Sequence, residues 1–139
     1  MKVIYTFYKV YIYRVYEWEY DLVTNDHIKV DVASLEDVVS DIAWCQNVLN
    51  YDTMAVGSRN GNVEIYHRDK SHGEWEKIST LKHKSIVCRV GWTQTGNILQ
   101  VCLISGETYF YKQSLVGFND WVFLSKVTSD GAVEYEPDK

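Results

Sequence analysis

The sequence is poor in proline and carries no excess of positive charge. It has one proline in 139 residues, and 14 Lys and Arg against 19 Asp and Glu give a net charge of −5. A protein that holds a phosphate backbone needs a basic surface, so this balance argues against nucleic-acid binding. Helical periodicity is almost absent as well, and the pattern predicts only one short helix or turn, around Ser34–Val39.

Cysteines are few and odd in number: Cys45, Cys88 and Cys102. A secreted domain held by disulfides usually has an even and denser set, so we expect a reducing, cytosolic or nuclear compartment. The first sixteen residues are apolar, but Lys9 and Arg14 interrupt them and no small-residue cleavage site follows. The segment is too short and too polar to span a bilayer, and we interpret it as a strand without direct membrane insertion.

What the sequence does contain is apolar and aromatic residues, at 46% and 14%, including eleven Tyr and five Trp. This composition is typical of a globular, β-rich chain. Asn60-Gly61 predicts a two-residue hairpin, because both positions tolerate a positive φ. Short apolar runs between turn residues predict the strands Asp41–Trp44, Thr53–Ser58, Val63–His67, Glu74–Leu81, Ile86–Trp92, Ile98–Ile104, Glu107–Lys112 and Trp121–Val127.

These strands fall into two repeats of one pattern. The landmark pairs Trp44/Trp92, Gly61/Gly106, Tyr66/Tyr111 and Trp75/Trp121 are separated by 48, 45, 45 and 46 residues. Repeats of this length with four strands each are typical of propeller blades. We therefore predict an all-β partial propeller with blades over residues 34–82 and 83–128, a partial blade or divergent strands over 1–33, and an acidic, solvated tail over 129–139.

A weaker third copy lies upstream. Val10–Arg14 resembles Val63–His67, so the N-terminal region is expected to hold the last two strands of a preceding blade, followed by a long connection over Thr24–Ser34. Six of the eleven Tyr lie in the first twenty residues. They form either a buried strand pair or an exposed edge that binds a partner, and we favour the buried pair. We expect Trp44 and Trp92 in the core, and partial exposure for Trp75 and Trp121.

Residues 83–96 resemble the opening of a WD repeat. The places of that pattern are filled by His83, Val87, Val90, Trp92 and Gly96, with Gly96 expected to form a turn over Gln94–Asn97. The preceding repeat matches less fully. Leu35 stands in place of the His, Asn60 in place of the usual Asp, and Tyr66-His67 in place of Trp-Asp, so the hydrogen-bonded tetrad of the family is incomplete in both repeats.

Within the WD-repeat family, residues 36–128 are similar to the last two blades of the SEC-thirteen family, the small subunit of the COPII outer coat and of the nuclear pore's Y-shaped scaffold. The most specific stretch is Arg89–Leu99, followed by Tyr111–Gln113 and by a Gly and a Trp before the last strand. The resemblance implies a non-enzymatic scaffold in ER-to-Golgi vesicle coats or at the nuclear pore. It also implies an open propeller that an elongated coat subunit or nucleoporin completes by adding strands, with no cofactor and no small-molecule substrate.

Three groups of residues suggest a chemical site, and a structural role explains each of them better. His67, His72 and His83 with Cys88 lack metal-ligand spacing, and His83 is interpreted as a blade-junction residue that bonds to backbone. A Ser85–His83–Asp120 triad lacks a nucleophile-elbow motif. The glycine-rich stretch Gly57–Gly61 is not followed by a helix, so a hairpin explains it better than a phosphate loop. The sequence thus predicts no catalytic, cofactor-binding or metal-binding residue.

Two other functions remain open: a generic WD-repeat adaptor with other partners, and a small intracellular ligand-binding β-barrel. At about 40–45 residues per blade the chain holds about three blades, whereas a closed propeller needs at least about four. We therefore expect either a truncated form of a longer propeller or open edges that other chains cover, and we favour truncation.

Overall fold

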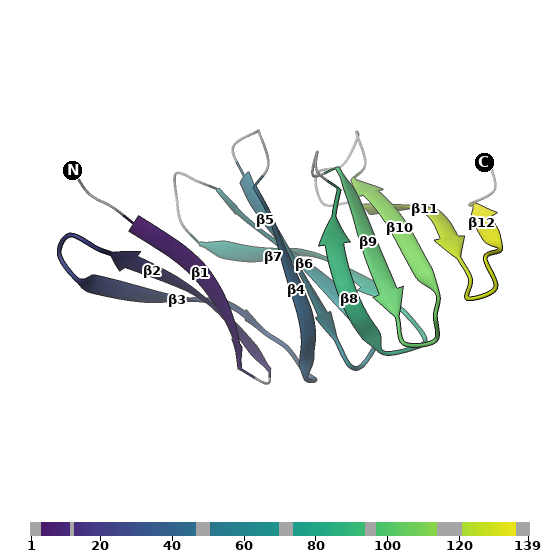
Figure 1. Ribbon diagram of the computed structural model, residues 1–139, viewed down its shortest axis with the longest axis horizontal. Helices are drawn as coiled ribbons and strands as arrows, with labels where there is room; N and C mark the ends of the chain where they lie inside the picture. The colour runs from purple at the N-terminus through teal and green to yellow at the C-terminus, as the bar shows by residue number, and fades with distance from the viewer. Residues whose placement is uncertain are drawn as a thin grey trace.

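The computed structural model describes residues 4–11, 13–46, 51–69, 74–93, 97–113 and 121–135. In these residues the chain forms twelve strands in three open antiparallel sheets, which follow one another in sequence order along the molecule (Figure 1). The all-β partial propeller is therefore confirmed, and the closed ligand-binding barrel is wrong, because the strands do not join into a single sheet. The segment around Ser34–Val39 is a bend between two strands. The described residues include no helix long and apolar enough to cross a membrane.

The N-terminal sheet has three strands in the order β1 (Ile4–Tyr11), β2 (Arg14–Asp21) and β3 (Asp26–Ser34). Two expectations are corrected here. Residues 26–34 form a strand and not a connection, and the stretch Val10–Arg14 spans the turn between β1 and β2, so it does not correspond to the strand Val63–His67. The Tyr side chains before Tyr13 lie outside the described side chains. Tyr13 itself is half exposed and Tyr16 is buried.

The central sheet consists of β4 (Val39–Gln46), β5 (Tyr51–Ser58), β6 (Asn62–Asp69) and β7 (Trp75–Lys82), paired in chain order. The strand pattern predicted for this repeat is confirmed. Its β5–β6 turn differs from the prediction, because Gly61 has a φ of 92° but Asn60 does not have a positive φ. The loop therefore has three residues, 59–61, with Gly61 alone in the left-handed region, and Gly61 N donates to the Ser58 carbonyl.

The C-terminal sheet consists of β8 (Val87–Trp92), β9 (Ile98–Leu103), β10 (Thr108–Gln113), β11 (Trp121–Val127) and β12 (Val133–Tyr135). The first four strands confirm the second repeat. The fifth was not predicted: Gly131 turns the chain with a φ of 89°, and Val133 pairs with Val127. The expected turn at Gly96 lies outside the described residues.

Two separate cores lie between consecutive sheets, and β5 contributes to both. Met54 and Val56 pack with Val15 and Val32 of the N-terminal sheet, whereas Ala55 packs with residues of the C-terminal sheet. Successive strand residues point to opposite faces, so a strand buried on both sides needs an unbroken apolar run. The buried side chains of the second core come from both sheets: Ala55, Val63, Ile65, Val87, Val90, Leu99, Val101, Leu103 and Tyr111.

Candidate interaction surface

Polar contacts connect each sheet to the next, and we call these places of contact the joints. At each joint, the loop that enters a sheet bonds to a turn of the sheet before it. Leu35 N donates to the Tyr13 carbonyl at 2.8 Å, and His83 N donates to the Gly61 carbonyl at 3.0 Å. Leu35 and His83 are the equivalent positions in the two repeats, so one backbone bond recurs at both joints although the side chains differ.

His83 also uses both of its ring nitrogens at the second joint. Nδ1 lies 2.8 Å from the Gly61 carbonyl oxygen, and Nε2 lies 2.7 Å from the Tyr111 hydroxyl. The carbonyl can only accept, so Nδ1 carries the proton and Nε2 accepts from Tyr111. Burial lowers the pKa of His83 and raises that of Tyr111, so both groups are neutral near pH 7. The predicted junction role of His83 is confirmed, with Tyr111 completing the link.

The structure bears on each of the three chemical sites that the sequence suggested: the metal site, the triad and the phosphate loop. His72 and Asp120 lie outside the described residues, and both ring nitrogens of His83 are occupied by partners other than Ser85. Within the described segments, no group of three or more His, Cys, Asp and Glu is placed to hold a metal ion. Gly57–Gly61 ends one strand and forms the turn into the next, as the hairpin interpretation expects. Cys45, Cys88 and Cys102 form no disulfide bond in the described residues.

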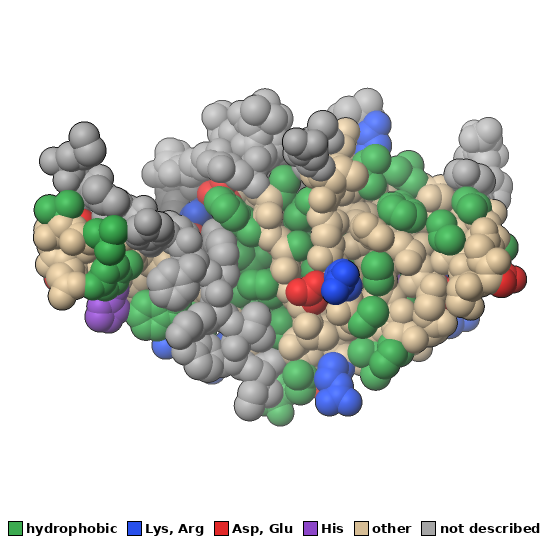
Figure 2. Space-filling view, in the orientation of Figure 1, with side chains coloured by type: hydrophobic (Ala, Val, Ile, Leu, Met, Phe, Trp, Pro, Cys, Tyr) green, Lys and Arg blue, Asp and Glu red, His purple; other side chains and the backbone are tan. Residues whose placement is uncertain are grey.

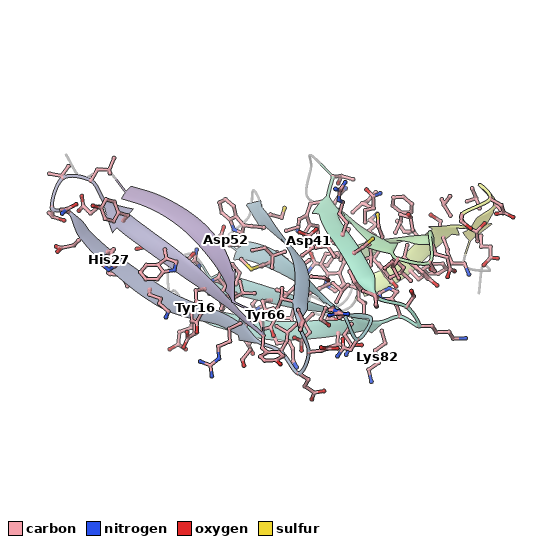
Figure 3. All side chains as sticks on the ribbon, turned by 60° about the horizontal axis from the view of Figure 1, so that its bottom comes forward. Tyr16, His27, Asp41, Asp52, Tyr66 and Lys82 are labelled. Carbon is pink, nitrogen blue, oxygen red and sulfur yellow. The ribbon has the colours of Figure 1, made fainter. Side chains whose placement is uncertain are left out.

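A buried ion triad joins the N-terminal sheet to the central sheet. Arg68 on β6 donates to Glu17 on β2 and, at 2.9 Å, to Asp52 on β5. The triad was not predicted from the sequence, because its members lie up to 51 residues apart and have no motif. Figure 3 shows Asp52 on the central sheet. Glu17 is 1% exposed and Asp52 is 5% exposed, and the Arg68 guanidinium also lies over the Trp75 ring at 4.7 Å.

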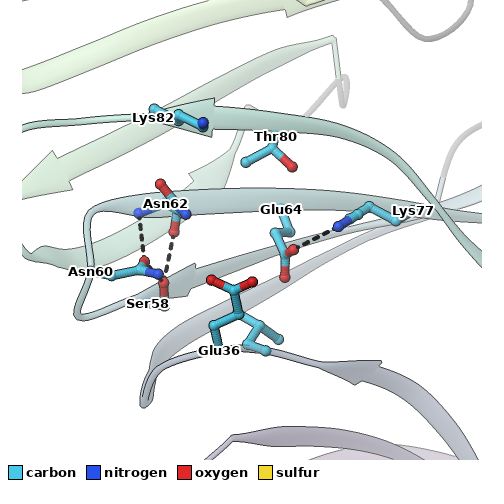
Figure 4. A pocket seen from close by; sticks show the side chains of 9 residues that line it. Glu36, Ser58, Asn60, Asn62, Glu64, Lys77, Thr80 and Lys82 are labelled. Atoms are coloured by element: carbon cyan, nitrogen blue, oxygen red, sulfur yellow. Dashed lines mark hydrogen bonds and ion pairs between the residues drawn. The ribbon is translucent and has the colours of Figure 1, made fainter.

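One polar pocket of about 200 Å³ lies where the loop after β3 meets the central sheet (Figure 4). Two carboxylates, Glu36 and Glu64, and two ammonium groups, Lys77 and Lys82, face it, so its charges balance. Lys77 and Glu64 are paired at 3.1 Å. This balance gives the pocket no preference for a ligand of one charge.

The tryptophan side chains differ in how much of their surface is exposed to solvent. Trp92 is partly buried and packs against the second core: its indole lies 5.3 Å from that of Trp121 between ring centroids, and its Nε1 donates to the Ala43 carbonyl of the neighbouring sheet at 2.9 Å. Trp44 is 41% exposed, so its assignment to the core is wrong. Its exposure depends on what lies beside β4, which local sequence does not encode. Trp75 and Trp121 are partly exposed, as expected.

In the described part of the chain, each of the three sheets ends in two strands that pair on one side only: β1 and β3, β4 and β7, and β8 and β12. Unpaired backbone groups along such an edge are donors and acceptors for an added strand. Hydrophobic side chains are spread over the face shown in Figure 2, with acidic and basic side chains next to one another near its middle.

Sheet order, repeat spacing and joint geometry together define the class: this is a partial WD-repeat β-propeller, with edges suited to protein contacts. No family model matches the sequence. The solved structure of Saccharomyces cerevisiae Sqt1 has a similar fold, with a TM-score of 0.53 at 16% identity over 65% of this chain and 23% of that chain.

Proteins that are similar in sequence show to which family within this class the chain belongs. The chain is 31% identical to the Schizosaccharomyces pombe "Protein transport protein sec13" over 116 residues, 81% of this chain and 38% of that protein. It is 37% identical to the Arabidopsis thaliana "Protein transport protein SEC13 homolog A" over 82 residues, 58% of this chain and 27% of that protein. The resemblance to the SEC-thirteen family is confirmed, and the chain spans roughly a third of the length of these curated relatives.

Proposed function

We propose that this chain is part of a non-enzymatic scaffold in a membrane coat, acting through protein–protein contacts in transport from the ER to the Golgi. The observation that carries the proposal is the run of relatives named protein transport proteins, at about 30% identity across most of the chain. The fold supports it, because contacts at His83 and Arg68 join consecutive sheets and the charges that line the polar pocket balance.

The units of this scaffold are proposed to be two WD-like blades over residues 34–82 and 83–128. Residues 1–33 would supply part of a preceding blade, and 129–139 an acidic segment after the last. The recurring backbone bonds from Leu35 and His83 support a unit boundary just before each of these residues. We propose no catalytic, cofactor-binding or metal-binding residue in any of them.

The proposed partner is the elongated coat subunit, or the corresponding nucleoporin, with the chain located in the cytoplasm at vesicle coats or at the pore. The free edges of β1 and β12 support such a partner, because strand addition needs an unpaired edge. No nucleic acid or inserted membrane segment takes part in this proposal.

Direct binding to a purified partner tests the function. The 139-residue chain is mixed with the purified elongated coat subunit and, separately, with an unrelated helical-repeat protein, and complexes are measured by size-exclusion chromatography with light scattering. We expect a complex of defined stoichiometry with the coat subunit alone. Equal behaviour of the two proteins, or no complex at micromolar concentration, would contradict the coat role and favour a WD-repeat adaptor with other partners.

A further inference from the structure

Two cysteines, Cys88 and Cys102, lie on neighbouring strands at a point where the pairing of β8 and β9 is irregular. The register of this pair shifts between Val87 and Arg89, so Cys88 is the additional residue of a β-bulge. In a bulge, two residues of one strand stand opposite one residue of its neighbour, and here Cys88 and Arg89 stand opposite Cys102. Residues that face each other in an antiparallel pair have Cα atoms about 4.5–5.5 Å apart, within the span of about 4.4–6.8 Å that a disulfide requires.

The two side chains point to the same face of the C-terminal sheet. Val87 and Val101 are buried in the second core. Successive strand residues point to opposite faces, so the neighbouring residues Cys88 and Cys102 point away from that core. A direct contact agrees with this placement, because Cys88 Sγ donates to the Cys102 carbonyl oxygen at 3.2 Å.

The Cys102 sulfur has two weak contacts of its own. Gln100 Nε2 lies 3.6 Å from it and Thr108 Oγ1 lies 3.8 Å from it. Thr108 belongs to β10, so the sulfur is turned toward that strand. A change of the Cys102 χ1 rotamer turns the sulfur toward β8 instead and gives up only these two weak bonds. The spacing of β8 and β9 then allows the two sulfurs to meet.

We propose that Cys88 and Cys102 are a reversible redox pair, which hydrogen peroxide converts into a disulfide across β8 and β9. Cys88 is exposed and Cys102 is half-buried, so the Cys88 thiolate attacks first. It breaks the O–O bond, becomes a sulfenic acid and releases one water after protonation. The Cys102 thiolate then attacks the Cys88 sulfur and displaces a second water. In sum, the two thiols lose two electrons and two protons, and one peroxide is reduced to two waters.

The reverse reaction needs only a small thiol. A thiolate of glutathione or of a dithiol attacks the disulfide, forms a mixed disulfide with one cysteine, and a second thiol releases that cysteine. Cys45 does not belong to the pair. It is buried on β4 of the central sheet, and burial raises the pKa of its thiol, which keeps it protonated and unreactive.

The disulfide would act on the strand that carries the second joint. On β8, Val90 N donates to Asp41 Oδ2 of the central sheet at 2.9 Å. The Trp92 indole on the same strand donates to the central sheet as well. A covalent link from β8 to β9 closes a loop over residues 88–102 and restricts the unfolded chain, so we expect oxidation to raise the urea midpoint and to slow amide exchange in β8. The reaction needs no partner and does not depend on the proposed scaffold role.

Peptide mapping of the oxidised chain tests the pair. The full chain is treated with hydrogen peroxide, remaining thiols are blocked with N-ethylmaleimide, and the monomer is digested with trypsin without reductant. Cleavage after Arg89 separates the two cysteines, so their disulfide links the peptides 85–89 and 90–112. We expect this linked pair as the main disulfide product, and we expect it to disappear after treatment with dithiothreitol.

Three variants assign the roles. We expect Cys88→Ser and Cys102→Ser each to abolish the linked peptides, and Cys45→Ala to leave them unchanged. Cys102→Ser should retain a sulfenic acid at Cys88, which dimedone labels, whereas Cys88→Ser should give no such label at Cys102. Thermal melting shows whether each variant folds, and Cys102→Ala replaces Cys102→Ser if the latter does not.

Proximity of the reduced thiols is measured separately with phenylarsine oxide, which binds two neighbouring sulfurs at once. We expect it to bind the wild type and Cys45→Ala, and not Cys88→Ser or Cys102→Ser. Several results would overturn the proposal: disulfides only between two chains, a link that includes Cys45, or oxidation to sulfinic acid without linked peptides. Equal urea midpoints and equal β8 exchange in the oxidised and reduced chains would overturn the effect on the joint.

Discussion

His83 places two donors on one acceptor, because its backbone N–H and its ring Nδ1 lie 3.0 and 2.8 Å from the carbonyl oxygen of Gly61. This pair of bonds fixes the start of the C-terminal sheet against the turn of the central sheet. Burial lowers the pKa of His83, so the imidazole is neutral near pH 7 and Nε2 accepts from the Tyr111 hydroxyl.

The first prediction concerns pH. Burial lowers the pKa of folded His83 below its ordinary value of 6.5, so as pH falls the unfolded chain binds the proton first. The free energy of unfolding therefore decreases below about pH 6.5, at up to about 1.4 kcal/mol per pH unit, until the folded pKa is passed. Urea unfolding of the wild type and of His83→Gln, compared from about pH 8 to about pH 5, measures this. Parallel curves for the two proteins would rule out His83 as the source.

Gly61 tests the turn itself. Its φ is 92°, and a Cβ added there would lie 2.4 Å from the His83 carbonyl oxygen. We expect Gly61→Val to lower the free energy of unfolding by at least about 2 kcal/mol, because a β-branched residue is strained at positive φ. Gly91→Ala is the matched control, since nothing lies within 4 Å of a Cβ there. An unchanged melting temperature for Gly61→Val would reject the turn geometry.

Trp92 tests the packing of one sheet on the next. We expect Trp92→Ala to cost about 3 kcal/mol in urea unfolding through lost packing, and Trp92→Phe about 1 kcal/mol through the lost hydrogen bond to Ala43. Since Trp44 is more exposed, truncating it is expected to cost less. A loss below about 1 kcal/mol for Trp92→Ala would contradict the observed packing against Trp121.

The ion triad predicts a strong effect on stability for removal of the Arg68 guanidinium, which is 14% exposed. Arg68→Met leaves Glu17 and Asp52 buried without their cation, so we expect a loss of about 3 kcal/mol. Adding Glu17→Gln should restore part of it, because one buried charge is then removed. Lys77→Met breaks an exposed pair with Glu64 and should change stability by less than about 1 kcal/mol. Equal effects of Arg68→Met and Lys77→Met in urea unfolding would contradict a buried triad.

The strands from β4 to β11 could be predicted because their landmarks have local causes. Gly61 and Gly106 recur because each supplies a positive φ between strands, and Val39 and Val87 recur because both are buried between sheets. Such requirements appear directly in residue type and spacing, so the strand bounds were predicted to within two residues.

The missed strand β3 has a local signal, because Ile28, Val30 and Val32 alternate with polar residues as in a half-buried strand. The other features that were missed depend on partners distant in sequence. Glu17, Asp52 and Arg68 meet only when two sheets pack. Trp44 has the same place in its repeat as Trp92, but it is 41% exposed. His83 could be assigned to a junction from its place in the WD pattern, but its bond to Tyr111 required the structure.

The alternation of β5 between two cores has a consequence for the cooperativity of unfolding. Met54 and Val56 pack against the N-terminal sheet, and Ala55 packs against the C-terminal sheet. Either outer sheet can therefore detach while the remaining outer sheet stays packed on the central sheet. Loss of β5 removes both cores at once. The molecule then behaves as a short array with nearest-neighbour coupling, in which amide protection is greatest in β5 and decreases toward each end of the chain.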